Sequence, residues 1–157
     1  MGMNARTLLG AAVASVAMTI AGNGVAAADS WVDPAEYTVG DTVYFSGAMG
    51  GCTIRPNGDV GCELNGRGVW YGIPTPDLAI DAAFLPAHPT FGLFGHYARP
   101  GAKGMPWDNQ APYDREITSL INYAGATCVN ITGPNASIAC DSKGHYFRYG
   151  VRGTEFR

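Results

Sequence analysis

The stretch Cys-Thr-Ile-Arg-Pro-Asn-Gly-Asp-Val-Gly-Cys at residues 52–62 decides the fold, because it encodes a β-hairpin with a fixed register. Pro56 presets φ for the first central position of a type I turn, and Asn57 suits the second. Gly58 suits the left-handed residue that follows in a three-residue hairpin loop with a bulge. We therefore expect two antiparallel strands joined tightly at Pro56-Asn57-Gly58.

This turn determines which residues face each other across the hairpin. Counting outward from the turn gives the pairs Arg55 with Asp59, Ile54 with Val60, Thr53 with Gly61, and Cys52 with Cys62. Directly facing residues of antiparallel strands lie within disulfide reach. The sequence therefore predicts a Cys52–Cys62 disulfide across the two strands.

The phrase at residues 56–72 returns at residues 134–150, with six of seventeen positions identical. The match includes the cysteines at positions 62 and 140. Duplication, or convergence on one hairpin design, accounts for such a repeat, and coincidence in a glycine-rich chain is the alternative. We interpret the repeat as two similar hairpins in one domain.

The second hairpin brings Cys128 opposite Cys140 if its loop spans residues 132–136, because Pro134 is disfavoured at the second central position of a type I turn. We expect two local disulfides rather than cross-links between the phrases. The alternative use of the cysteines is a zinc site. Nine and eleven residues intervene within the two pairs, unlike the short spacing of zinc knuckles.

Further strands are expected around the hairpins. The aromatic runs at residues 68–72 and 145–151 are typical of strands, and Gly66 and Gly144 before them indicate turns. Other expected strands are short and apolar, at residues 37–39, 42–45 and 117–123, the last of which also fits a short helix. The fold class predicted is a single, mostly antiparallel β domain with at most one short helix.

Residues 73–118 carry seven of the ten prolines, so we expect ordered loop there rather than regular structure. One short helix is expected inside this segment. Thr75 would cap it, Asp77 would lie in its first turn, and Pro86 would end it. Residues 91–97 are a further strand candidate.

The amino terminus has the pattern of a secretory signal peptide. Arg6 precedes an apolar run at residues 8–20, and small residues lead to Ala26-Ala27-Ala28, an A-x-A cleavage pattern. The apolar run is too short to span a bilayer. We expect cleavage after Ala28 and one secreted domain at residues 29–157, outside the cell or in the cell envelope of a bacterium, with no membrane span after cleavage.

The composition bears on partners. A formal net charge of −3 with no basic cluster disfavours nucleic acid as a partner, and it offers no polybasic patch to anionic lipids. The sequence lacks G-x-G-x-x-G and P-loop patterns, so we expect no nucleotide and no other cofactor.

His145 is the main candidate for catalysis, because Asp141 lies four residues before it and a carboxylate can orient a general base. Such a histidine more often hydrogen-bonds a carbonyl. His88 and His96 lack a third ligand at a recognisable spacing, and Ser46 lacks the context of a nucleophile. We therefore predict neither a metal site nor a catalytic residue.

Aromatic side chains gather at matched positions of the two phrases, and they are the candidate binding residues together with His145: Trp70, Tyr71, Tyr146, Phe147 and Tyr149. Strand alternation places about half of such a set outside the core. Exposed aromatic rings stack on sugars or anchor partner proteins. The alternative is that they fill the core.

The motifs "SGAMGGCTIRPNGDVGCEL" and "INYAGATCVNITGPNASIACDSKGHYFRYGVRGTEF" resemble an uncharacterised family of small secreted bacterial domains. That family carries two cysteine pairs and a terminal Gly-His-Gly-Phe element, where this chain has Gly144-His145-Tyr146-Phe147. The resemblance covers under half of residues 29–157. It implies export, two disulfides and a β-rich fold, and it implies no chemistry.

We expect a secreted, non-enzymatic module that binds an envelope component or another exported protein. The alternatives are a small secreted hydrolase that uses His145 or a carboxylate pair, and a protease-inhibitor-like protein that presents residues 54–59 as a rigid loop.

Overall fold

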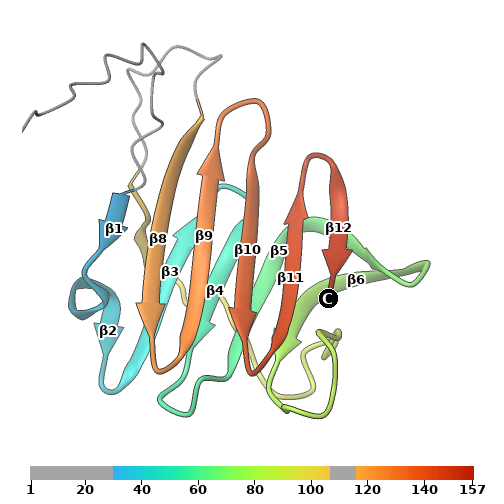
Figure 1. Ribbon diagram of the computed structural model, residues 1–157, viewed down its shortest axis with the longest axis horizontal. Helices are drawn as coiled ribbons and strands as arrows, with labels where there is room; N and C mark the ends of the chain where they lie inside the picture. Colours follow the sequence, from blue (N-terminus) through green and yellow to red (C-terminus); the bar gives the residue numbers. More distant parts are fainter. Residues whose placement is uncertain (1–29, 107–115) are drawn as a thin grey trace, which may run out of the picture.

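The computed structural model describes residues 30–106 and 116–157 and is mainly β, with antiparallel sheets and two disulfide-tied hairpins, as the sequence predicts (Figure 1). The expected signal peptide lies outside the described residues. The described segments hold no α-helix. Their elements, in chain order, are β1 (Ser30–Val32), the 3₁₀ helix η1 (Pro34–Tyr37), β2 (Thr38–Val39), β3 (Thr42–Gly47), β4 (Gly50–Ile54), β5 (Val60–Trp70), β6 (Ile73–Ile80), β7 (Lys103–Gly104), β8 (Ile117–Tyr123), β9 (Ala126–Thr132), β10 (Ser137–Ser142), β11 (His145–Gly150) and β12 (Gly153–Phe156).

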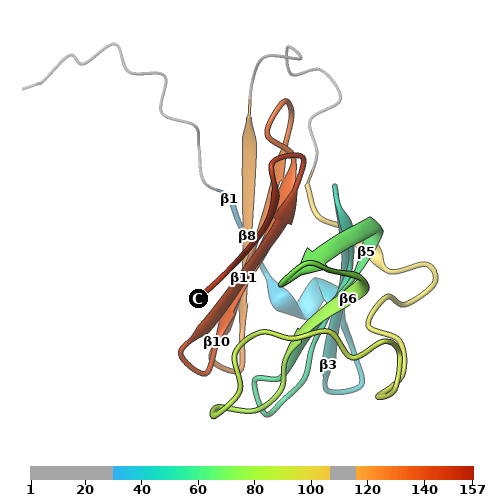
Figure 2. The ribbon, with the colours of Figure 1, turned by 90° about the vertical axis from the view of Figure 1, so that its right-hand side faces the viewer.

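The strands form two sheets that pack face to face (Figure 2). We call them sheet A, in the order β1-β8-β9-β10-β11-β12, and sheet B, in the order β2-β3-β4-β5-β6, with β7 beside β3. The pairings β1–β8 and β3–β7 are parallel, and the others are antiparallel. Each sheet therefore contains one of the two repeated phrases.

The core lies where the two sheets meet. Alternation along β9, whose residues are in turn buried and half-buried, shows how one face of a strand enters the core. The bulkiest fully buried side chains are apolar and come from both sheets: Phe45, Ile54 and Leu78 from sheet B, and Ile121, Ile138 and Phe147 from sheet A. Burial of these side chains is the main stabilising term for a domain of this size.

The register of the first hairpin agrees with the sequence. Cys52 faces Cys62, Thr53 faces Gly61, and Ile54 faces Val60. The Arg55 amide donates to the Asp59 carbonyl at 2.8 Å, and Gly58 adopts φ +80°. The turn chemistry therefore determined the pairing correctly.

The second hairpin also follows its predicted loop. Ile131 faces Ser137, which leaves residues 132–136 as the connection, and Cys128 faces Cys140. Both local disulfides are formed. The strand interpretation of residues 117–123 is confirmed as β8, whereas the expected strand at residues 37–39 begins one residue later because Tyr37 ends η1.

Three of the further hairpins close with a two-residue turn in which a left-handed residue is followed by a left-handed glycine: Tyr71-Gly72, Ala124-Gly125 and Lys143-Gly144. Both central residues of a type I′ turn need positive φ, which glycine adopts freely. The turn expected at Gly144 is confirmed. The turn expected at Gly66 is wrong, because β5 runs through that position with a bulge between Glu63 and Gly68.

The structure differs most from the sequence-based expectation in the proline-rich segment. The helix expected between Thr75 and Pro86 is wrong, because residues 73–80 form strand β6 at an edge of the main path of sheet B. Pro76 lies opposite the β5 bulge, where the regular ladder is interrupted, and an edge strand tolerates prolines that cannot donate a hydrogen bond. The strand expected at residues 91–97 is wrong, because residues 91–94 form turns and residues 95–97 are irregular.

Candidate binding surface

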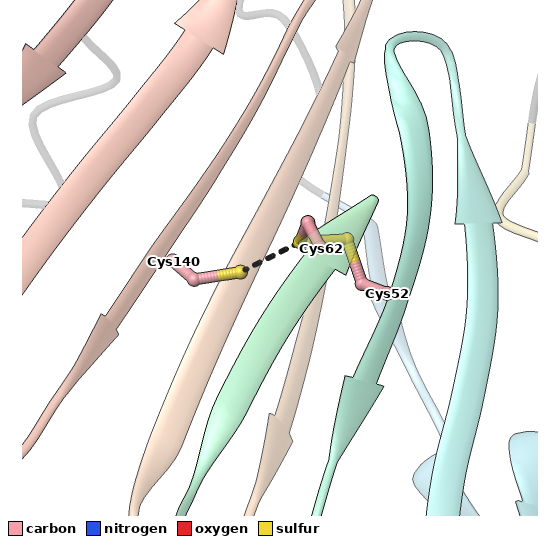
Figure 3. Close-up of side chains that lie close together, drawn as sticks. All are labelled: Cys52, Cys62 and Cys140. Atoms are coloured by element: carbon pink, nitrogen blue, oxygen red, sulfur yellow. Dashed lines mark hydrogen bonds between the residues drawn. A yellow bond between two sulfur atoms is a disulfide. The ribbon is translucent and has the colours of Figure 1, made fainter. Parts of the chain in front are cut away.

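The cysteines lie in the core, where Cys140 of the second disulfide lies against the Cys52–Cys62 disulfide (Figure 3). The Cys62 and Cys140 sulfurs are 3.9 Å apart, so the disulfide of sheet B contacts the disulfide of sheet A. Sulfurs of Cys52, Cys62 and Cys140 lie within 4.8 Å of one another. All four cysteines are disulfide-bonded, and metals bind the thiolate form, so this cluster serves as packing in the oxidised protein.

His145 contacts the backbone. Its Nε2 lies 3.0 Å from the carbonyl of Ala83, which ties the loop after β6 to the start of β11. Asp141, the expected orienting carboxylate, is exposed on β10 and faces Tyr146 in the register. His145 therefore lies at a carbonyl oxygen, which was the alternative to catalysis given from the sequence.

The other two histidines contact different carboxylates. His88 Nε2 lies 3.5 Å from Asp81, and His96 Nδ1 lies 2.8 Å from Glu63. Ser46 belongs to β3, where its carbonyl accepts a hydrogen bond from the Met105 amide. The described contacts place these candidates at separate points of the fold.

The aromatic candidates divide between core and surface. Phe147 is fully buried and Tyr149 is nearly so. Trp70 is half-buried and donates from Nε1 to the Ala87 carbonyl at 2.9 Å, while Tyr146 is half-buried beneath Arg157. Hence these four side chains serve packing at least in part.

Tyr71 is the one largely exposed member of the set, at 72%. It occupies the left-handed position of the β5–β6 turn, its ring stacks on Phe156 with centroids 5.8 Å apart, and the Trp70 ring meets it edge-on. Of the aromatic binding surface that the sequence indicated, only this small group around Tyr71 is exposed.

A larger group of exposed apolar side chains lies in the proline-rich segment, for which the sequence predicts loop with a strand candidate at residues 91–97. Residues 87–102, which we call the strap, cross the face of sheet B that points away from sheet A; Figure 2 shows the yellow part of this segment on that side. The strap begins beside β6, where Ala79 and His88 exchange two backbone hydrogen bonds. The outer face of sheet B is therefore covered by irregular chain.

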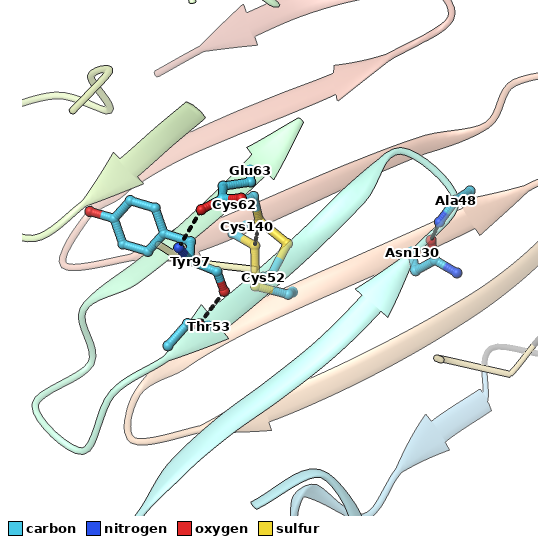
Figure 4. The surroundings of a disulfide bond; sticks show 9 residues. Ala48, Cys52, Thr53, Cys62, Glu63, Tyr97, Asn130 and Cys140 are labelled. Carbon is cyan, nitrogen blue, oxygen red and sulfur yellow. Dashed lines mark hydrogen bonds between the residues drawn. A yellow bond between two sulfur atoms is a disulfide. The ribbon is translucent and has the colours of Figure 1, made fainter. Parts of the chain in front are cut away.

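Tyr97 anchors the strap to sheet B (Figure 4). Its amide donates to Glu63 Oε1 at 3.0 Å, and its carbonyl accepts from the Thr53 hydroxyl. Its ring lies on Gly61, where an added Cβ would come within 2.2 Å of ring carbons. Burial raises the pKa of the Tyr97 hydroxyl.

Asp77 holds the next part of the strap. This side chain is 2% exposed and accepts four hydrogen bonds from a single turn of chain. They come from the Thr90 amide at 2.7 Å, the Thr90 hydroxyl at 2.7 Å, the Phe91 amide at 3.0 Å and the Gly92 amide at 3.0 Å. Charge-assisted bonds of this kind are about twice as strong as neutral ones, so the carboxylate fixes the local backbone.

The turn held by Asp77 presents three large apolar side chains, which we call the apolar tip: Phe91, Leu93 and Phe94, exposed by 53, 81 and 63%. Phe91 adopts φ +51° and Gly92 φ +74°, and the Leu93 amide donates to the Thr90 carbonyl at 3.0 Å. A bulky residue with positive φ needs support from its surroundings, and here Asp77 supplies it.

This site was not predicted from the sequence, because Asp77 has the pattern of a first helical turn and residues 91–97 have that of a strand. A usable signal was present in Thr90-Phe-Gly-Leu-Phe-Gly95, where two glycines flank large apolar residues in a proline-rich segment. Glycines three residues apart permit the turns that expose such side chains.

Comparison with known proteins found no match to a family model, to a curated protein or to a solved structure. Within residues 30–106 and 116–157, none of the helical structure is long or apolar enough to cross a membrane.

Proposed function

We propose that this protein is a secreted, non-enzymatic binding module that acts in the cell envelope or the extracellular space. The observation that carries the proposal is the apolar tip on a backbone held by the buried Asp77 carboxylate. Two disulfides support export, because disulfides persist in oxidising compartments.

An exposed apolar cluster on a rigid loop fits recognition. Large side chains held outside the core expose apolar area to water, and contiguous exposed patches mark interaction sites. A loop fixed before binding loses little conformational entropy when its partner arrives. The hydrogen bonds from Thr90, Phe91 and Gly92 to Asp77 supply that preorganisation.

The alternatives receive less support. His145 contacts the Ala83 carbonyl, whereas His88 and His96 contact two different carboxylates, so the described contacts do not gather the three histidines around one catalytic group. The loop expected for an inhibitor is pinned to the body, because the Gly58 carbonyl accepts from Ser142 at 2.6 Å and Lys143 pairs with Asp59.

Sedimentation with insoluble peptidoglycan and with phospholipid vesicles tests the proposal. The secreted protein is expected to pellet with at least one of them, and the double variant Leu93→Ser/Phe94→Ser is expected to remain in solution. The matched control is Val151→Ser, which removes an apolar side chain exposed by 59% at the β11–β12 turn. Equal behaviour of wild type and double variant on both materials would contradict the proposal.

A further inference from the structure

We infer that the partner of the apolar tip is the lipid–water interface of a membrane, into which Phe91, Leu93 and Phe94 insert. This inference rests on the proposed function and names the partner class for the same surface. It concerns shallow insertion of one loop and requires no membrane-spanning segment.

The exposed shape and uncharged composition of the loop favour a lipid surface as its partner. Side chains exposed by 81% at Leu93 and 63% at Phe94 project from the surface. Residues 82–95 contain no Asp, Glu, Lys or Arg, and their one titratable side chain, His88, points to Asp81. An uncharged projection meets no charge-desolvation cost when it enters the acyl boundary.

Four backbone amides in and beside the tip meet part of the requirement that lipid imposes. Moving a backbone amide from water into lipid without a hydrogen-bond partner costs free energy. Here the Phe91 and Gly92 amides bond to Asp77, the Leu93 amide bonds to the Thr90 carbonyl, and the Gly95 amide bonds to the Gly92 carbonyl at 3.2 Å. These four donors are satisfied within the protein, so they need no water.

The charge that follows the tip is complementary to phosphate headgroups. Residues 82–106 carry Arg99 and Lys103 and no carboxylate, although the whole chain has a formal net charge of −3. Lys103 pairs with Glu36, so Arg99 is the cation of this segment that can meet a headgroup. Arg99 is exposed, and its guanidinium lies 5.1 Å from the centroid of the Tyr44 ring. Cations next to an inserted loop lie at the level of the lipid phosphates. A rigid protein groove would not by itself explain an uncharged tip that is followed along the chain by an exposed arginine.

Vesicle flotation of the secreted protein measures the partition coefficient. The N-terminus is verified by mass spectrometry, since the apolar run at residues 8–20 would itself bind lipid. With vesicles of phosphatidylethanolamine and phosphatidylglycerol, Leu93→Ser and Phe94→Ser are each expected to lower the coefficient by about tenfold. Val151→Ser is expected to leave it unchanged. Binding should persist at high salt, because apolar insertion is its main driving force.

Insertion itself is read from Phe94→Trp. Its added emission should shift to the blue with vesicles, and brominated lipid chains should quench it. Peptidoglycan binding without vesicle binding would overturn this inference and leave the proposed function standing, whereas loss of both would overturn both. Self-association that the tip variants abolish, without vesicle binding, would assign the tip to a second copy of this chain instead.

Discussion

The Cys62 and Cys140 sulfurs lie 3.9 Å apart at the centre of the molecule, where the two disulfides meet. Cys62 and Cys140 are also the matched cysteines of the repeated phrase. The repeat is therefore expressed in space as two hairpins, one per sheet, that pack disulfide against disulfide. This contact has a chemical consequence when one cysteine is removed.

In Cys52→Ser, we expect thiol–disulfide exchange across the sheets. The freed Cys62 thiolate attacks the Cys140 sulfur, a Cys62–Cys140 bond forms, the Cys128–Cys140 bond breaks, and Cys128 leaves as a thiolate that takes up the proton. Alkylation after oxidative refolding, followed by mass spectrometry of unreduced peptides, should find free thiol at both Cys62 and Cys128.

The matched control is Cys52→Ser/Cys62→Ser, in which no thiol is left to attack and Cys128–Cys140 should remain intact. Free thiol at Cys62 alone in the single variant would show that the 3.9 Å contact does not permit exchange.

The sequence was sufficient to predict the hairpins because local turn chemistry determines them. The turn at residues 56–58 sets the register of the first hairpin, and counting outward from it places Cys52 opposite Cys62. The pairing of sheet with sheet has no such local signal. That Cys62 would contact Cys140, or that β12 would follow β11 at the edge of sheet A, depends on packing between residues distant in sequence.

We expect Asp77→Asn to lower the free energy of unfolding by about 1–3 kcal/mol, because an amide oxygen cannot accept all four bonds that the carboxylate accepts. Urea unfolding measures this. Asp81→Asn is the matched control, since Asp81 is partly exposed and its side chain contacts His88 at 3.5 Å. A loss as large in Asp81→Asn as in Asp77→Asn would refute the special role of Asp77.

Gly61→Ala should displace the strap, because the new Cβ would meet the Tyr97 ring at 2.2 Å. Overpacking of this kind costs about 1–3 kcal/mol, and thermal unfolding measures it. Gly104→Ala is the control, since the nearest atom to its Cβ is the Ser46 hydroxyl at 3.6 Å. Equal stability of the two variants would mean that Tyr97 does not pack on Gly61 in solution.

Stability should fall with rising pH in the alkaline range. Burial raises the pKa of Tyr97, so above the ordinary tyrosine pKa of about 10 the unfolded chain releases a proton that the folded protein retains. The unfolded state then binds fewer protons, and the free energy of unfolding decreases until the folded hydroxyl also ionises. Tyr97→Phe should show a shallower alkaline decline in urea unfolding; a decline as steep as that of wild type would contradict this.

Neither β6 nor its attachment to the strap could be predicted from the sequence, and particular residues show why. Pro74 and Pro76 are unfavourable in a central strand, yet β6 is an edge strand with a bulge opposite Pro76. Asp77 after a threonine and a proline has the pattern of a helix start, and only the tertiary fold brings Thr90 and Gly92 to its carboxylate. Long-range hydrogen bonds of this kind leave no periodic trace in the sequence.

The central claim is that sheet B holds the strap so that its apolar tip is presented on a rigid backbone. Amide hydrogen exchange by NMR tests this most directly at Phe91 and Gly92, whose amides donate to the buried Asp77 carboxylate. Both amides should be strongly protected in the wild type and should exchange much faster in Asp77→Asn. Exchange of both at the rate of an unstructured peptide in the wild type would contradict the account.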